Sequence, residues 1–191
     1  MPNLKPIHDH VVAMLHAGLP ISLSYHNISH TLDVMQQCYI IATEEGITDH
    51  QTLFELQIAA LYHDTGFLFV YYGHEEKSCE LAREQLPSFG LTNDQIDRIC
   101  ELIMATKVPQ QPNTHLQEII CDADLDYLGR PDFFETGNNL HLELMAYNLI
   151  DGKHDWEERQ LQFLESHQYF TQTSRLKRGP IQEEFIQQMR G

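Results

Sequence analysis

Residues 61–66, with the sequence LYHDTG, combine side chains that could bind a metal ion. His63 offers a neutral imidazole nitrogen and the adjacent Asp64 a hard anionic oxygen, so the pair could hold one divalent cation. An apolar run precedes the pair and Gly66 follows it, which predicts that both ligands lie at the C-terminal end of a buried helix. Two ligands do not make a specific site, so the others must come from elsewhere in the chain.

Two histidines and two aspartates are candidates for the missing ligands. His26 and His30 lie four residues apart and project from one helix face, where surface or capping roles are the ordinary explanation. A histidine among apolar inward positions needs a partner when it is buried, which favours His30. Asp122 and Asp124 follow an apolar run. One of them could simply cap or turn the chain, but a carboxylate against the core must be paired or bind metal.

These residues predict a site made of His30, His63, Asp64 and one of the two acids. Two imidazoles and two carboxylates suit one divalent ion, with Mn, Fe, Co, Ni, Mg and Zn all acceptable. Such an ion lowers the pKa of a bound water and neutralises phosphoryl oxygens, so that an acidic protein could accept an anionic substrate.

Nearly every segment that must position these ligands has the apolar periodicity of a helix, and none shows the alternation of a strand. The predicted helices span residues 7–15, 27–45, 48–61, 74–86, 92–106, 114–125, 133–150 and 156–169, with a last one from Pro180. Capping boxes are predicted at Thr48 with Gln51, Thr92 with Gln95 and Thr114 with Gln117. We therefore expect an all-α fold, a single compact helical bundle over residues 1–191.

The composition narrows the classes of partner. The chain has 12 Lys plus Arg against 28 Asp plus Glu, a formal net charge of −16 that opposes binding to nucleic-acid polymers and anionic membranes. Its longest apolar run, residues 67–72, is too short to span a bilayer, and its first residues lack a secretory signal. The cysteines have no metal-binding spacing and are expected as buried free thiols, namely Cys38, Cys79, Cys100 and Cys121. Together these features predict a cytoplasmic protein.

The order H…HD…D in an all-helical chain of this size resembles the HD-domain superfamily of metal-dependent phosphohydrolases. His30 stands in the family's HT..V setting, residues 61–66 look like its LHDxG segment, and residues 123–125 are similar to its ADxL segment, which selects Asp124. The resemblance covers residues 25–130, about half of the chain, and leaves residues 131–191 as C-terminal packing helices. It implies hydrolysis of a phosphomonoester or phosphodiester, often a nucleotide.

Residues 73–78, GHEEKS, also resemble a family element that follows the HD pair. In family members with two metals, this histidine and a second one complete another site, but Thr106 stands at the plausible position of the second histidine. This departure favours one metal ion over two. It also argues against a di-iron oxygenase, a second activity known among HD-domain relatives.

Residues near the predicted ligands could act on the substrate. We count His74 and Glu75, with Asp64, as catalytic candidates, although acids at positions 75 and 76 would also favour a helix N-terminus electrostatically. The substrate-binding candidates are His26, Lys107 and Arg130. For any single Lys or Arg, solvated surface charge is the more frequent explanation.

Some alternatives stay open at this point. The aromatic residues of segment 67–72 could line a nucleobase pocket or form core beneath a loop. A non-catalytic metal- or nucleotide-binding module would have the same ligands as the hydrolase. Apolar helical faces leave room for a homodimer, and the sequence does not identify the substrate.

Overall fold

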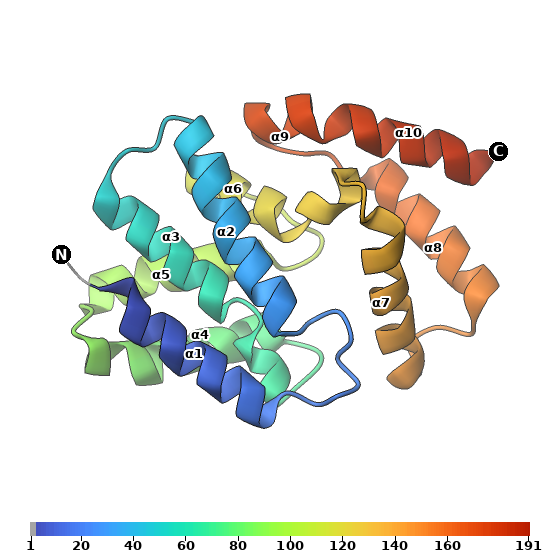
Figure 1. Ribbon diagram of the computed structural model, residues 1–191. Coiled ribbons are helices and arrows are strands. Elements are labelled where there is room, and N and C mark those ends of the chain that lie inside the picture. The colour runs from blue at the N-terminus through green and yellow to red at the C-terminus, as the bar shows by residue number, and fades with distance from the viewer. Residues whose placement is uncertain (1–2) are drawn as a thin grey trace.

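The computed structural model describes residues 3–191, with Lys153 described by its backbone alone, and this part of the chain is helical without strands. The α-helices, drawn in Figure 1, are α1 (Leu4–Gly18), α2 (Ile28–Glu44), α3 (His50–Tyr62), α4 (His74–Gln85), α5 (Asn93–Ala105), α6 (His115–Asp124), α7 (Phe133–Ala146), α8 (Lys153–Ser166), α9 (Gln172–Lys177) and α10 (Gly179–Arg190). Three short 3-10 helices are η1 (Thr65–Leu68), η2 (Leu86–Phe89) and η3 (Asp126–Gly129). The prediction of an all-α fold is confirmed. Met1 and Pro2, which the predicted domain includes, lie outside the described residues.

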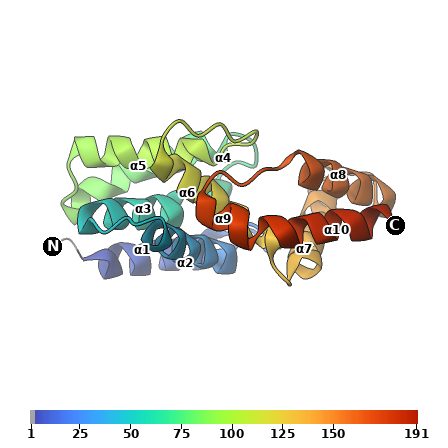
Figure 2. The same ribbon diagram turned by 90° about the horizontal axis from the view of Figure 1, so that it is seen from above.

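The helices form two groups that lie side by side (Figures 1 and 2). Helices α1 to α6 surround one apolar cluster, to which α3 contributes fully buried residues such as Leu56, Ile58 and Leu61. A second cluster joins η3, α7, α8 and α10, with Phe133 and Leu164 at its centre. Helix α9 lies where the two groups meet, against α2. Full burial of one such aliphatic or aromatic side chain contributes about 1.5–3 kcal/mol. The extent of a single domain over the chain stays a prediction.

Helix α3 is buried nearly all round, and this explains where the HD pair lies. Every residue from Leu53 to Tyr62 except Gln57 is buried, so the C-terminal end of α3 lies inside the molecule. The Thr65 hydroxyl donates to the Tyr62 carbonyl oxygen at 2.8 Å and satisfies one of the helix-end carbonyls. The backbone N–H of Gly66 then donates to Ser78 Oγ on α4 at 2.8 Å.

Gly66 is required by close packing between the end of α3 and the start of α4. A Cβ atom at this position would lie 2.0 Å from the carbonyl oxygen of His74, which is a backbone atom that cannot rotate away. The glycine that closes the LYHDTG segment therefore lets α4 approach the HD pair.

The predicted capping boxes have three different outcomes. The Thr92–Gln95 box is confirmed, since each side chain pairs with the backbone of the other residue. At Thr114 only half of the box forms, because the Gln117 side chain accepts from the backbone N–H of Asn113 instead. The Thr48–Gln51 box is wrong: Asp49 caps α3, since its carboxylate accepts from the backbone N–H of Thr52 at 2.7 Å.

The ends of the C-terminal helices also differ from prediction. Helix α7 ends at Ala146 rather than Ile150, and α8 spans residues 153–166 rather than 156–169. The short helix α9 was not predicted, whereas Pro180 lies in the first turn of α10 as expected. Across the described residues, no helix has the length and apolarity that a bilayer crossing requires.

Candidate metal centre

Three helix ends bring the predicted ligands together. His30 lies in the first turn of α2, where the Asn27 side chain caps the helix by accepting from the backbone N–H groups of Ser29 and His30. His63 and Asp64 follow the last residue of α3, and Asp124 is the last residue of α6. Helix α2 packs on both α3 and α6, so these ends converge although they are far apart in the sequence.

The facing atoms of His30, His63 and Asp124 are spaced like ligands of one ion, and Asp64 contacts both histidines from the side. His30 Nε2 lies 3.4 Å from Asp64 Oδ2 and 3.2 Å from Asp124 Oδ1. His63 Nε2 lies 3.2 Å from the same Asp64 oxygen and 3.4 Å from the same Asp124 oxygen, and the two Nε2 atoms are 3.4 Å apart. Tetrahedral ligand atoms about 2.1 Å from a metal ion lie about 3.4 Å from one another. His30, His63 and Asp124 thus form a candidate metal-binding group within the described residues.

Hydrogen bonds fix how the ligands present their lone pairs. His63 Nδ1–H donates to the Ala60 carbonyl oxygen at 2.7 Å, so Nε2 is the nitrogen that faces the cluster. Asp64 Oδ2 is buried and has no hydrogen-bond partner within residues 3–191. A buried carboxylate oxygen without a partner is unfavourable unless a cation or proton compensates it. The donor set and this orphaned oxygen both fit a divalent metal ion.

The charges in the cluster keep the carboxylates ionised. Burial raises the pKa of Asp124, but the hydrogen bonds and charges of His30 and His63 outweigh burial and lower the pKa to about 2. The pKa of Asp64 is also lowered, because the neighbouring histidines outweigh a similar burial effect. Both carboxylates can therefore bind a cation at neutral pH.

Asp122, the other acid of the DAD segment, has a structural role. Its buried carboxylate accepts the backbone N–H groups of Phe170 and Thr171, each at 2.8 Å, and the Thr171 hydroxyl at 2.7 Å. These bonds fix the segment that leads into α9. Asp122 is thereby satisfied, and only Asp124 of the two acids faces the histidines.

His74 and Glu75 lie in the first turn of α4, beside the cluster. His74 Nδ1–H donates to the Tyr71 carbonyl oxygen at 3.0 Å. The other ring nitrogen, Nε2, lies 3.5 Å from Asp64 Oδ1 and 3.5 Å from Glu75 Oε1. Glu75 itself is buried, which places both catalytic candidates within reach of groups bound at the cluster.

A cavity of about 370 Å³, here called the site cavity, opens onto the metal cluster, the name used here for the candidate ligand side chains around His30, His63 and Asp124. Asp64 and Asp124 lie in its wall. Its remaining lining is mainly aromatic and histidine side chains with a few aliphatic and polar ones: Tyr25, His26, Phe67, Tyr71, Tyr72, Gly73, His74, Glu75, Thr106, Lys107, Val108, Leu125, Tyr127, Leu140 and Phe163. Of the predicted aromatic set, Phe69 is the exception, since it does not line the cavity and is 61% exposed.

The two predicted phosphate-binding cations are paired with acids. Lys107 lines the site cavity, but its ammonium group forms an ion pair with Glu76. Arg130 faces a separate hollow of about 230 Å³ on the other side of Asp124. Its guanidinium contacts Asp33 at 2.7 Å and Asp132 at 2.9 Å. Neither side chain is therefore a free cation for a phosphate.

Glu143 of α7 is a site residue that the sequence analysis missed. Its side chain is fully buried, and Oε2 accepts the backbone N–H groups of Tyr25 at 2.9 Å and His26 at 3.0 Å. Oε1 accepts from His26 Nδ1 at 2.5 Å and from the Tyr71 hydroxyl at 3.1 Å. The sequence does show a glutamate among apolar residues of a predicted helix, which indicates a buried charge that needs a partner. No local sequence pattern identifies His26 as that partner.

The Glu143 carboxylate raises the pKa of His26. Burial lowers the pKa of His26, but the hydrogen bond and charge of Glu143 and the charge of Asp64 outweigh burial and raise it. Since Nδ1 is bonded to Glu143, Nε2 is the nitrogen left to face the site cavity. The ring stacks on Phe67 at a centroid distance of 4.3 Å, and Phe67 also contacts the ring of His74 at 3.9 Å.

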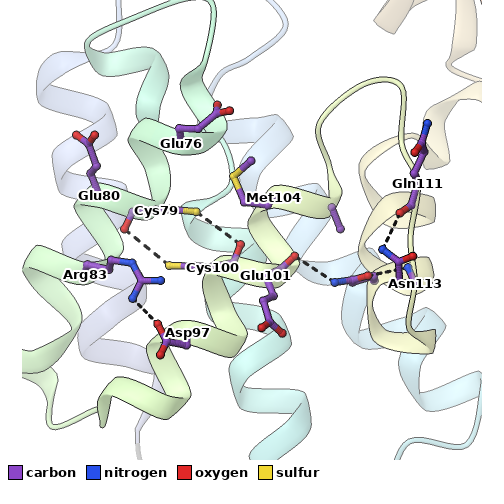
Figure 3. A pocket seen from close by; sticks show the side chains of 12 residues that line it. Glu76, Cys79, Glu80, Arg83, Asp97, Cys100, Glu101, Met104, Gln111 and Asn113 are labelled. Carbon is purple, nitrogen blue, oxygen red and sulfur yellow. Dashed lines mark hydrogen bonds and ion pairs between the residues drawn. The ribbon is translucent and has the colours of Figure 1, made fainter.

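A larger hollow of about 710 Å³ lies along α4 and α5, away from the metal cluster (Figure 3). The thiols of Cys79 and Cys100 each donate to the carbonyl oxygen of the other residue, at 3.6 and 3.8 Å. Arg83 in its wall is paired with Asp97. The prediction of buried free thiols is confirmed for all four cysteines. With Arg83 paired and its thiols bonded, this hollow has no group of side chains, among the described residues, comparable to the cluster of His30, His63 and Asp124.

Comparisons with known proteins agree with this geometry. Three solved structures share the fold: a predicted HD superfamily hydrolase from an uncultured Thermotogales bacterium, Bacillus subtilis YpgQ in complex with ADP, and the Lin1889 protein from Listeria innocua. Their identities to this chain are 22%, 18% and 19%, and their TM-scores are 0.62, 0.65 and 0.64. The alignments cover 94%, 97% and 99% of this chain and 89%, 94% and 96% of the other chains, in the same order.

Sequence comparison identifies the family. No curated protein sequence matches the chain significantly. The family model described as HD domain, however, matches residues 27–126, which is just over half of the chain and includes all four clustered ligands. The chain therefore belongs to the HD-domain family.

Proposed function

We propose that this chain is a metal-dependent phosphohydrolase that cleaves a phosphomonoester or phosphodiester. The observation that carries the proposal is the buried, unpartnered Asp64 Oδ2, which lies 3.2–3.4 Å from the Nε2 atoms of His30 and His63. Together with Asp124, these residues would hold one divalent ion, with Mn, Fe, Co, Ni, Mg and Zn all compatible with the donors. When bound, the ion supplies Lewis-acid chemistry, which lowers the pKa of water and neutralises phosphoryl oxygens.

The residues around the cluster would handle the protons of the reaction. His74 Nδ1–H donates to the Tyr71 carbonyl oxygen, so Nε2 is the ring nitrogen that would exchange a proton with attacking water. Glu75 lies 3.5 Å from the same nitrogen and supports the protonated ring. These roles agree with the position of both residues in the wall of the site cavity.

His26 is the candidate for protonating the leaving group. Glu143 binds its Nδ1–H and stabilises the charged ring, so Nε2 can carry a second proton toward the site cavity. His26 then acts as a general acid, and Glu143 positions it in the way that a buried carboxylate orients a catalytic imidazole. This assignment replaces the simpler substrate-binding role predicted for His26.

A nucleotide is the proposed substrate. Aromatic side chains in the wall of the site cavity offer apolar contact surface to an organic substrate, and YpgQ, whose fold is similar, is described in complex with ADP. Because Lys107 and Arg130 are both paired, the phosphate charge would be balanced chiefly at the metal cluster. A single ion is preferred over two because Thr106, in place of a second histidine, donates its hydroxyl to the Ile103 carbonyl.

The test combines metal content with phosphate release. Wild type is expected to bind about one metal per chain and to release phosphate from at least one nucleotide in a screen with Mn, Co, Ni and Mg. Asp64→Ala is expected to lose both properties. Asp94→Ala, an exposed acid on α5, is the matched control and is expected to keep both.

The outcomes distinguish a hydrolase from a non-catalytic binding module. Metal binding without turnover of any phosphoester would contradict the hydrolase and favour a metal- or nucleotide-binding module. Absence of metal under every loading condition would refute the whole assignment of the cluster.

A further inference from the structure

A second cavity of about 370 Å³, here called the side cavity, adjoins the site cavity. Val108, Leu125 and Phe163 line both, so the two cavities share one wall. The other residues of the side cavity are Pro109, Gln110, Ser166, His167, Gln168 and Phe170. It therefore lies between the loop after α5 and the C-terminal end of α8, beside the metal ligand Asp124.

The side cavity is electrically neutral, unlike most of this acidic chain. None of its described lining residues is Asp, Glu, Lys or Arg. Burial lowers the pKa of His167 to about 4, so its imidazole is uncharged at neutral pH. A phosphate would find no positive charge there, whereas an uncharged part of a substrate would meet no repulsion.

Two buried polar atoms in this cavity lack hydrogen-bond partners among the described residues: Gln110 Oε1 and His167 Nε2. The amide orientation of Gln110 is fixed because its Nε2 faces Asp124 Oδ2 at 3.4 Å, and a carboxylate requires a donor. Oε1 is consequently left as an acceptor. Buried polar groups are normally satisfied, so these two atoms on residues that line one cavity are candidates to bond a ligand there.

Aromatic rings give the side cavity a shape suited to a flat group. Phe163 and Phe170 line it, and the His167 ring lies nearly parallel to Phe163, at a centroid distance of 6.2 Å and an angle of 17°. The Tyr169 ring packs edge-on against His167 at 4.7 Å and holds it in place. Flat apolar walls with a few fixed polar groups are typical of sites that bind planar organic ligands.

We propose that the side cavity binds the non-reacting end of the substrate, an uncharged nitrogen heterocycle that hydrogen-bonds Gln110 Oε1 and His167 Nε2. This inference rests on the proposed function, because it assumes that the phosphate group of the same molecule lies in the site cavity. A nucleobase has the required chemistry, since its edge carries both N–H donors and ring-nitrogen or carbonyl acceptors. Gln110 would then connect the bound base with the ligand Asp124.

Nucleosides, which lack the phosphate, test the side cavity separately from catalysis. Binding of adenosine, guanosine, cytidine and uridine to the full chain is measured by ligand-observed NMR titration, with methyl β-D-riboside as an abasic probe. We expect at least one nucleoside, and not the riboside, to bind to wild type and equally to Asp64→Ala. His167→Phe and Gln110→Met should each weaken that binding about tenfold, the effect of one hydrogen bond of ordinary strength.

His50→Phe makes the same chemical change at an exposed position in the first turn of α3 and is expected to leave binding unchanged. Melting curves show whether each variant folds. If His167→Phe does not fold, Gln110→Met alone tests the proposal. The side-cavity proposal would be overturned if none of the four nucleosides bound to wild type. It would also be overturned if His167→Phe and Gln110→Met bound the nucleoside as tightly as wild type does. Nucleoside binding without phosphate release from any nucleotide would instead refute the hydrolase and leave the side cavity standing.

Discussion

Replacing Glu143 by glutamine tests the proposed pairing of this residue with His26. The change keeps the size of the side chain, but one oxygen becomes an amide NH2 group. Because Oε2 accepts two backbone N–H groups, the amide NH2 must take the Oε1 position, where it can donate only to the Tyr71 hydroxyl oxygen and to a His26 Nδ1 that carries no proton. His26 also loses the negative charge that raises its pKa.

The expected size of the effect follows from these contacts. Replacing the hydrogen bonds to a buried carboxylate by bonds to a neutral amide should lower the free energy of unfolding by about 3 kcal/mol. For a chain of this size, that corresponds to a decrease in Tm of about 10 °C. If His26 is the general acid, kcat should also fall about 100-fold, because a positioned proton donor contributes at least this factor.

The assay compares Glu143→Gln with Glu55→Gln, measuring Tm, kcat and KM at a temperature where both variants are folded. Glu55 is also a buried glutamate, and it accepts two hydrogen bonds from Arg98, at 2.7 and 2.8 Å, but it does not line the site cavity. Glu55→Gln should therefore lower Tm and leave kcat within a few-fold of wild type. Equal kcat values for the two variants would refute the role given to Glu143.

Three further predictions follow from the structure. Gly66→Ala places a Cβ 2.0 Å from the His74 carbonyl oxygen, so Tm should fall by more than about 10 °C and bound metal should decrease, as calorimetry and metal analysis would show. The folded-state pKa of His167 is about 4 against 6.5 unfolded, so His167 binds more protons in the unfolded chain between these values. Between pH 7 and pH 5, urea titrations should show wild type losing about 1–2 kcal/mol of stability relative to His167→Phe. Asp124→Asn should lose the metal, whereas Asp122→Asn should lower Tm by several degrees and keep the metal.

The sequence predicted best those features that are encoded locally. Apolar periodicity located the helices, and ligand-type residues at helix ends identified His30, His63, Asp64 and Asp124, whose side chains the structure brings together. The sequence was less decisive where two adjacent residues could fill the same structural role. Thr48 and Asp49 are both good caps, and the capping residue is decided by which backbone N–H groups the chain exposes.

Tertiary partners were beyond the reach of local patterns. Arg130 looked like a phosphate ligand because it follows Asp124 closely, but in the fold it meets Asp33, which lies 97 positions away. Glu143 and His26 are separated by 117 positions, and their contact depends on how α7 packs against the segment before α2. Such pairs are determined by packing, so a single sequence indicates only that a buried charge needs some partner.

The C-terminal helices therefore do more than cover an apolar surface. The family match ends at residue 126, yet α7 supplies Glu143, and α8 supplies Phe163 to the walls of both cavities. His26 also lies just before the matched region. The four candidate metal ligands thus lie within the HD segment, whereas the groups proposed to protonate the leaving group and to bind the heterocycle lie mostly outside it. Because one fold serves proteins of many specificities, we expect these flanking elements to select the substrate.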